Sequence, residues 1–272
     1  MDQIKAMVEE LGAFDSVSHL SLAFHRLVMS RLLGAGMACA ALRELFRELL
    51  TRELNYHLQL RGLTGPAWSA GQLDDVVSLL DKRRARLRSV LAEACEVRVV
   101  GQGDEITRLV LAASCAYQLS LFDRSAEYLE QAIGLGADHP VLHFGLGFSQ
   151  YVLAERAFTE VDAQSGVRTV LDETGYREAM LRAVASFECG LSGGELDSYL
   201  SRWIGVCLEH AGFAEAASSA YYSAEVAQEG AVERGSAIRR LGSISAEEIA
   251  EVVECLKRPH AIVDVLGARE TH

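Results

Sequence analysis

The amino-acid sequence predicts an all-α protein in which short helices come in pairs. Alanine and leucine are plentiful, whereas the 272 residues include only three prolines. Alanine and leucine favour a helix most and proline disfavours it most. Apolar residues recur at intervals of three and four, which places them on one face of a helix. Glycines between these periodic segments mark where one helix ends and the next begins.

Residues 1–100 are predicted to form an N-terminal helical region. Glycines at 34 and 36 and a glycine-rich stretch over 62–71 interrupt its apolar stripes. The segment 96–100 is rich in β-branched residues, so it is compatible with a short strand or with a fraying helix end. The helices predicted here cover about residues 16–33, 38–58 and 73–91.

Residues 104–230 are predicted to form three helix pairs. Asp104 stands where its side chain can cap the first helix, and Pro140 opens the third helix. Gly212 makes a tight turn in the last pair, whereas an additional stretch, 164–175, separates the helices of the middle pair. This insertion is either a lip over a binding groove or an inert surface loop. The predicted helices cover about residues 104–120, 123–133, 141–163, 176–191, 196–211 and 214–229.

Residues 231–272 are predicted to form a C-terminal capping helix and a tail. Ser245 and Glu248 have the spacing of a capping box, in which each side chain bonds the other residue's free backbone N–H. Apolar residues recur with helical spacing from Ile249 to Leu256, which indicates a helix with one apolar face.

Three segments of the paired-helix region align with one another, each around a small residue. These residues are Ala113, Gly147 and Gly205, and the first two are 34 residues apart, which is the period of the tetratricopeptide repeat (TPR). Both glycines follow a branched apolar residue, and each pair resembles the Leu-Gly pair in the first helix of that repeat. In TPR proteins a neighbouring helix crosses close to this small residue. The segments 125–132 and 212–216 resemble the second helix and the turn before it.

The resemblance to the TPR family implies that the helix pairs stack into a short right-handed solenoid with a concave groove. It also implies a protein-binding function, as adaptor or chaperone, in which the first helices hold an extended or helical segment of a partner protein. Aromatic side chains suit such binding because they offer a large contact area at little entropic cost. Some of them, Phe144 above all, are alternatively packing residues between helices. The implied groove residues are Ser114, Tyr117, Gln118, Phe144, Phe148, Tyr151, Tyr199, Arg202, Glu209 and His210.

A narrower likeness is to the TPR chaperones of bacterial type III secretion systems, which hold an extended segment of a translocator. It rests on the segments 143–150 and 212–216 and on the acidic composition. The N-terminal region and the insertion 164–175 depart from that group, so a generic TPR adaptor is the other interpretation. Arg202 is the only lysine or arginine among the implied groove residues, which argues against capture of a C-terminal carboxylate and favours a hydrophobic ligand.

The charge of the chain argues against nucleic-acid binding. The net charge is −12 and the pI is about 5.2, whereas binding to phosphates needs lysine and arginine. A basic or amphipathic partner segment is the better electrostatic match. The basic run 82–88 is an exception, and it is either a docking patch for an acidic partner or a solvated helix face.

The sequence predicts neither a signal peptide nor membrane insertion. Its first residues lack a basic stretch followed by an apolar one. The longest apolar run, 32–42, is too short to cross a bilayer. The six cysteines show no C-x-x-C spacing. We therefore expect a soluble, cytoplasmic protein in a reducing compartment.

No residue pattern predicts catalysis, and we expect neither a cofactor nor a resident metal. Glu53 and His57 are four residues apart on one predicted helix face, but a metal needs three or four ligands and no second pair has suitable spacing. Two other classes of function stay open. One is a small-molecule sensor or enzyme built on a helical bundle, and the other is a structural homo-oligomer that assembles through the N-terminal helices.

Overall fold

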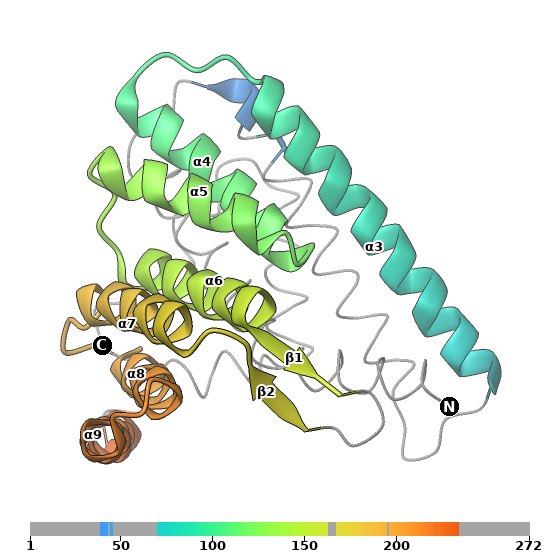
Figure 1. The fold of residues 1–272 in the computed structure, drawn as a ribbon. Helices are drawn as coiled ribbons and strands as arrows, with labels where there is room; N and C mark the ends of the chain where they lie inside the picture. The colour runs from blue at the N-terminus through green and yellow to red at the C-terminus, as the bar shows by residue number, and fades with distance from the viewer. Residues whose placement is uncertain (1–38, 43, 46–69, 163–166, 195, 234–272) are drawn as a thin grey trace.

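The computed structural model of the chain describes residues 39–42, 44–45, 70–162, 167–194 and 196–233. These residues are mostly helical, and the helices α3 to α9 follow one another along the chain (Figure 1). The predicted helix over 16–33, most of the one over 38–58 and the C-terminal helix predicted after Ser245 lie outside the described residues.

The first long helix, α3, spans Ala70–Glu96 and packs against α4, which spans Gln102–Gln118. Residues 97–100 are neither helix nor strand, so the strand considered for this segment is not formed. Gly101 precedes α4 with a φ of 108°, a conformation that glycine adopts readily. Because α4 begins before Asp104, that residue lies in its first turn, and its prediction as the capping residue is wrong.

The helices after α4 pack in chain order, so that each contacts the helix before it and the helix after it. The first helices of the three pairs, α4, α6 and α8, also contact one another in that order. All six helices predicted between residues 104 and 230 are present, whereas their stacking as a right-handed solenoid stays a prediction. The bounds of the later helices are Phe122–Gly134 for α5, Pro140–Phe158 for α6, Glu173–Cys189 for α7, Asp197–His210 for α8 and Ala214–Glu233 for α9.

Local sequence determines where two of these helices begin. The imidazole Nδ1 of His139 accepts a hydrogen bond from the backbone N–H of Val141 at 3.2 Å. Pro140 occupies the first helical position of α6, where the missing N–H costs nothing. Gly212 has a φ of 84° in the tight turn between α8 and α9. Both features confirm the sequence-based prediction.

The connection between α6 and α7 differs from the prediction. Instead of continuing to residue 163, α6 ends at Phe158, and the chain forms an antiparallel hairpin of two short strands, β1 (Thr159–Val161) and β2 (Arg168–Val170). The helix α7 then starts at Glu173, earlier than predicted, because the side chain of Asp172 accepts the backbone N–H groups of Thr174 and Gly175. The described residues are otherwise mostly helical, which agrees with the all-α prediction, and the two short strands are an addition to it. Each strand has only three residues, which is too short for alternation to be visible in the sequence.

Two glycines allow the helices of a pair to cross closely. A Cβ atom added at Gly147 of α6 would lie 2.8 Å from the ring of Phe187 on α7. A Cβ atom added at Gly205 of α8 would lie 2.5 Å from the ring of Tyr221 on α9. This confirms the expectation that a neighbouring helix crosses close to each of these residues.

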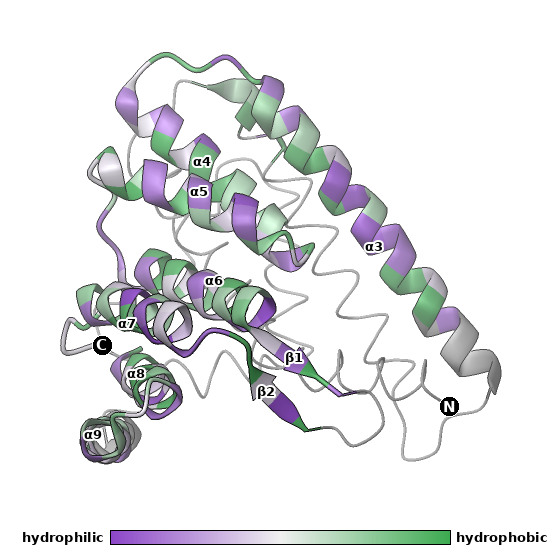
Figure 2. Cartoon of the chain, in the orientation of Figure 1, coloured by the Kyte–Doolittle hydropathy of each residue, from purple (hydrophilic) through white to green (hydrophobic). Residues whose placement is uncertain are grey.

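Each helix carries hydrophilic as well as hydrophobic residues (Figure 2). The hydrophobic ones supply a continuous core, whose largest fully buried side chains include Leu87, Leu142, Met180, Phe187 and Leu200. None of the helices in the described residues is both long enough and apolar enough to cross a membrane.

Candidate functional site

Rings on α4, α6 and α8 form a continuous row of contacts, which we call the aromatic row: Tyr117, Phe148, Tyr151, Trp203 and His210. The ring centroids of Tyr117 and Phe148 are 5.6 Å apart. Trp203 lies 4.9 Å from Phe148 and 5.2 Å from Tyr151, both in edge-to-face geometry. Tyr151 is 5.8 Å from the imidazole of His210. These distances are typical of favourable aromatic pairs.

Helical spacing brings the members of the aromatic row together. On α6, Phe148 and Tyr151 are three residues apart, and on α8, Trp203 and His210 are seven residues apart. Each pair therefore lies on one face of its helix. Because α6 contacts α8, the two faces meet and the rings interdigitate.

The aromatic row is buried at one end and partly exposed along the rest. Tyr117 is only 2% exposed, whereas Phe148, Tyr151, Trp203 and His210 are half-buried. Removal from water raises the pKa of the Tyr151 hydroxyl to about 12, and the nearby carboxylate of Glu155 adds to this effect. Tyr151 therefore presents a neutral hydroxyl at neutral pH.

Three of the predicted groove residues are buried and not exposed to a partner. Ser114, Tyr117 and Phe144 have exposed fractions of 1%, 2% and 4%. Phe144 lies 5.6 Å from Phe187 of α7, centroid to centroid. These side chains pack between helices, which is the alternative that the sequence left open for Phe144.

A fourth predicted residue, Gln118, is held by the long helix α3. Its side-chain oxygen accepts a hydrogen bond from the guanidinium of Arg83, and its amide donates to Ser114 Oγ at 3.2 Å. This contact with α3 partly covers the side chain of Gln118, which is half-buried. The sequence could not show it, because 35 residues separate Arg83 from Gln118.

The other predicted residues stand on exposed or half-buried parts of α8. Tyr199 is 38% exposed, and Arg202 and Glu209 are exposed as well. Glu209 accepts a hydrogen bond from the Tyr221 hydroxyl of α9 at 2.7 Å, so it faces the second helix of its own pair. Trp203 was not among the predicted groove residues. It follows Tyr199 by four residues, and this spacing indicates that both lie on one helix face.

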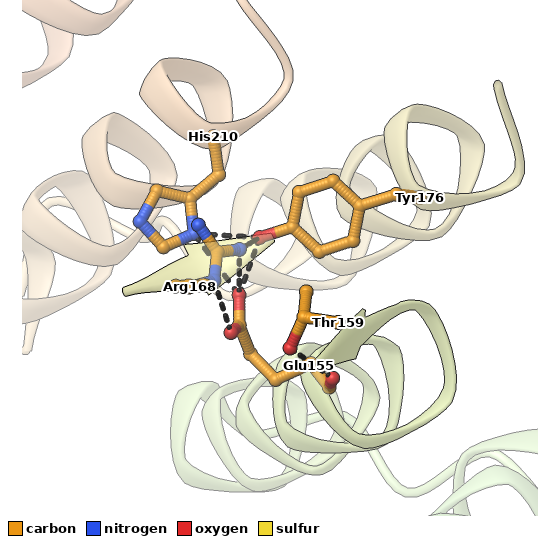
Figure 3. Close-up of polar contacts among 5 residues, drawn as sticks. All are labelled: Glu155, Thr159, Arg168, Tyr176 and His210. Carbon is orange, nitrogen blue, oxygen red and sulfur yellow. Dashed lines mark hydrogen bonds and ion pairs between the residues drawn. The ribbon is translucent and has the colours of Figure 1, made fainter. Parts of the chain in front are cut away.

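A polar cluster adjoins the aromatic row and joins the hairpin to three helices (Figure 3). It consists of Glu155 from α6, Arg168 from β2, Tyr176 from α7 and His210 from α8. The guanidinium of Arg168 donates two hydrogen bonds to the Glu155 carboxylate, from Nε to Oε2 at 2.9 Å and from Nη2 to Oε1 at 2.7 Å. The Tyr176 hydroxyl donates to Glu155 Oε1. His210 Nδ1 lies 2.8 Å from this hydroxyl and 3.2 Å from Oε1.

The members of the polar cluster satisfy one another. A two-pronged bond between guanidinium and carboxylate is strong and geometrically specific. Burial would lower the pKa of Arg168, but its hydrogen bonds and attraction to Glu155 outweigh burial and raise that pKa. Burial, followed by the bond to Glu155, raises the pKa of the Tyr176 hydroxyl. The cluster, which we also call the clasp, thus fixes the hairpin to the helices. Both carboxylate oxygens of Glu155 accept hydrogen bonds within it.

The described part of the chain contains no group of three or more histidine, cysteine, aspartate or glutamate side chains placed to hold a metal ion. Glu53 and His57 lie outside that part. His143, near the start of α6, lies 3.2 Å from Asp138. No described set of side chains therefore matches the ligand number of a structural or catalytic metal.

The basic run 82–88 on α3 is partly engaged in contacts within the chain. Arg83 binds Gln118, and Arg86 lies 3.5 Å from the carboxylate of Glu93. Lys82 and Arg88 are exposed. The run therefore contributes partly to contacts of α3 within the chain. Neither a docking patch nor a solvated helix face describes all of its residues.

No protein-family model, no curated protein and no solved structure matches this chain. The TPR resemblance therefore rests on the sequence alone and stays a prediction.

Proposed function

We propose that the protein is an interaction module that binds a segment of a partner polypeptide over α6 and α8. The observation that carries this proposal is the contact of Phe148, Tyr151 and Trp203, whose rings lie side by side across the two helices and stay half-buried. A partner's apolar side chain gains contact with several rings at once, and the rings lose little freedom because they already pack on the core.

The surroundings of these rings favour binding over chemistry. The nearest ionisable groups, Glu155 and His210, are engaged with Arg168 and Tyr176 in the polar cluster. A catalytic carboxylate or imidazole needs free access to a substrate proton. The side chains beside the aromatic row instead provide a fixed border for a bound segment.

The partner segment is apolar with basic residues. Apolar side chains complement the aromatic row, and the net charge of −12 attracts basic groups at long range. The resemblance to TPR proteins supports the same class of function and suggests an adaptor or a chaperone of the secretion type in a bacterial cytoplasm.

Binding of selected peptides tests this proposal. Peptides are selected from a random library against the full chain, and their affinities for Tyr151→Ala and Trp203→Ala are compared with the affinity for Tyr222→Ala. Tyr222 lies on α9 and is 69% exposed, so it is a matched aromatic control away from the row. We expect both row variants to bind about tenfold or more weakly and the control to bind normally. Circular dichroism checks that all variants keep their helices.

Equal affinities of the row variants and the control would exclude the aromatic row as the binding surface. A library that yields no binder, together with a thermal shift by a metabolite or a metal found by elemental analysis, would favour the sensor or enzyme class instead.

A further inference from the structure

The β1–β2 hairpin has an open strand edge beside the polar cluster. In an antiparallel pair, residues alternate between those bonded to the partner strand and those whose backbone groups point away. The Leu171 N–H bonds the Phe158 carbonyl at 2.8 Å, and the Asp162 N–H bonds the Val167 carbonyl at 2.9 Å. The observed register then places Arg168 opposite Val161 and Val170 opposite Thr159 at non-bonded positions.

On β2, the N–H and C=O groups of Arg168 and Val170 therefore point outward. Within the described residues, these four groups make no hydrogen bond. The bonds between the two strands are made by the neighbouring residues instead. On β1, the edge is less complete because the N–H of Thr159 bonds the Glu155 carbonyl of α6. Among the residues that the structure describes, the β2 edge thus offers four unpaired groups, two donors and two acceptors, in the spacing that an additional strand requires.

The β2 edge is also held rigidly, which an isolated two-stranded hairpin is not. Arg168 is fixed by Glu155, and Val170 packs against the hydrophobic core. The Thr159 hydroxyl on β1 donates to the Glu155 carbonyl at 2.6 Å. A partner strand would therefore meet a preformed edge and would not have to order the hairpin.

This edge lacks two of the features by which proteins protect exposed strands, namely proline and an unpaired outward charge, although its three-residue length is itself a protection. Proteins discourage pairing with outward charges or with proline. The charge of Arg168 is turned inward onto Glu155, and proline is absent from residues 159–171 of the sequence. Exposed strand edges can bind extended peptides by adding a strand.

Charge indicates what kind of segment fits. Glu160 on β1 and Glu173 at the start of α7 are exposed, whereas Arg168 is neutralised by Glu155. A second copy of this chain carries the same net charge of −12, and this repulsion disfavours pairing between copies. An extended segment with lysine or arginine is attracted instead.

We propose that the β2 edge pairs with an extended, basic and apolar segment of the partner protein, which forms a third strand of this sheet. This proposal rests on the proposed function and specifies the conformation of the bound segment. Because His210 belongs both to the polar cluster and to the aromatic row, the same segment can reach Tyr151 and Trp203 beyond the strand.

Hydrogen exchange of single amides, followed by NMR on the full chain, tests the pairing. The probe is a short synthetic peptide of alternating lysine and valine, and the comparison peptide has glutamate in place of lysine. We expect the lysine peptide to slow exchange at Arg168 and Val170, with no change at Val161 on the opposite edge, and the glutamate peptide to have no effect. No slowing at Arg168 and Val170, or slowing at Val161 alone, would overturn the proposal.

Proline variants provide a second measurement. Val170→Pro removes an outward donor of β2, and Val161→Pro removes the corresponding donor of β1 at an exposed residue. We expect about fivefold to tenfold weaker binding of the lysine peptide by Val170→Pro only, as for one lost hydrogen bond. Should Val170→Pro unfold, the exchange pattern of the unmodified chain decides alone.

The two proposals fail in different ways. Binding that depends on Tyr151 and Trp203 without protection of Arg168 and Val170 would leave the proposed function intact and refute strand pairing. Protection of these amides without peptide, in a chain that light scattering shows to be a dimer, would assign the edge to a second copy and refute the proposed occupant.

Discussion

The helix pair α6–α7 and the helix pair α8–α9 use the same means of close packing in different surroundings. In each pair, a glycine of the first helix lies under an aromatic ring of the second, Gly147 under Phe187 and Gly205 under Tyr221. Phe187 is fully buried, whereas Tyr221 is half-buried and donates to Glu209. The same sequence pattern thus packs into the core in one pair and lies near the surface in the other.

The connections of the two pairs differ as well. A tight turn at Gly212 joins α8 to α9, whereas the hairpin joins α6 to α7 and is clasped to them by Glu155 and Arg168. The middle pair should therefore lose more stability than the last pair when its contacts are changed.

The largest effect is expected from Gly147→Ala. The added methyl group would overlap three atoms of the Phe187 ring, which is fully buried. Overpacking of this kind costs about 1–3 kcal/mol, and the better helix propensity of alanine offsets only part of it. We expect the free energy of unfolding, measured in urea, to fall by about 1–2 kcal/mol. An unchanged or increased stability would contradict the packing described for this pair.

An intermediate effect is expected from Glu155→Gln. The neutral amide cannot accept both hydrogen bonds of the Arg168 guanidinium as the carboxylate does. The contact that holds the hairpin to α6 is therefore weaker. Because both side chains are partly exposed, we expect a loss of about 1 kcal/mol in the free energy of unfolding. Glu160→Gln, at an exposed position of β1, is the matched control and should change little. Equal effects of both variants would mean that the clasp does not stabilise the fold.

The smallest effect is expected from Gly205→Ala. Its methyl group would also meet a ring, but Tyr221 is half-buried and can turn toward solvent at the cost of its bond to Glu209. The gain in helix propensity, about 1 kcal/mol, roughly offsets this cost. The urea midpoint should therefore stay close to that of the unmodified chain. A loss as large as that of Gly147→Ala would show that the two crossings are equally constrained.

Sequence reasoning was sufficient where local chemistry determines the structure. His139 and Pro140 mark the start of α6, and Gly212 forms the turn between α8 and α9. Both features could be predicted because they involve residues close in sequence. The strands of the hairpin could not be predicted, since three residues show no period. Their stability depends on contacts of Arg168 and Thr159 with Glu155.

The candidate site was predictable only in part for a similar reason. The resemblance to TPR proteins placed Phe148, Tyr151 and His210 among the groove residues, but exposure depends on which helices lie above a residue. Ser114 and Tyr117 are buried by packing that the sequence does not reveal. The polar cluster joins residues up to 55 positions apart, so only the structure could bring them together.

Fluorescence of Trp203 tests the central claim most directly. The chain has two tryptophans, so a Trp68→Phe variant leaves Trp203 as the only one. If a selected peptide binds over α6 and α8, it removes water from this half-buried indole. We then expect its emission to shift to shorter wavelength and its quenching by acrylamide to decrease as the peptide saturates the protein. Saturable binding that leaves both the emission and the quenching of Trp203 unchanged would contradict the account.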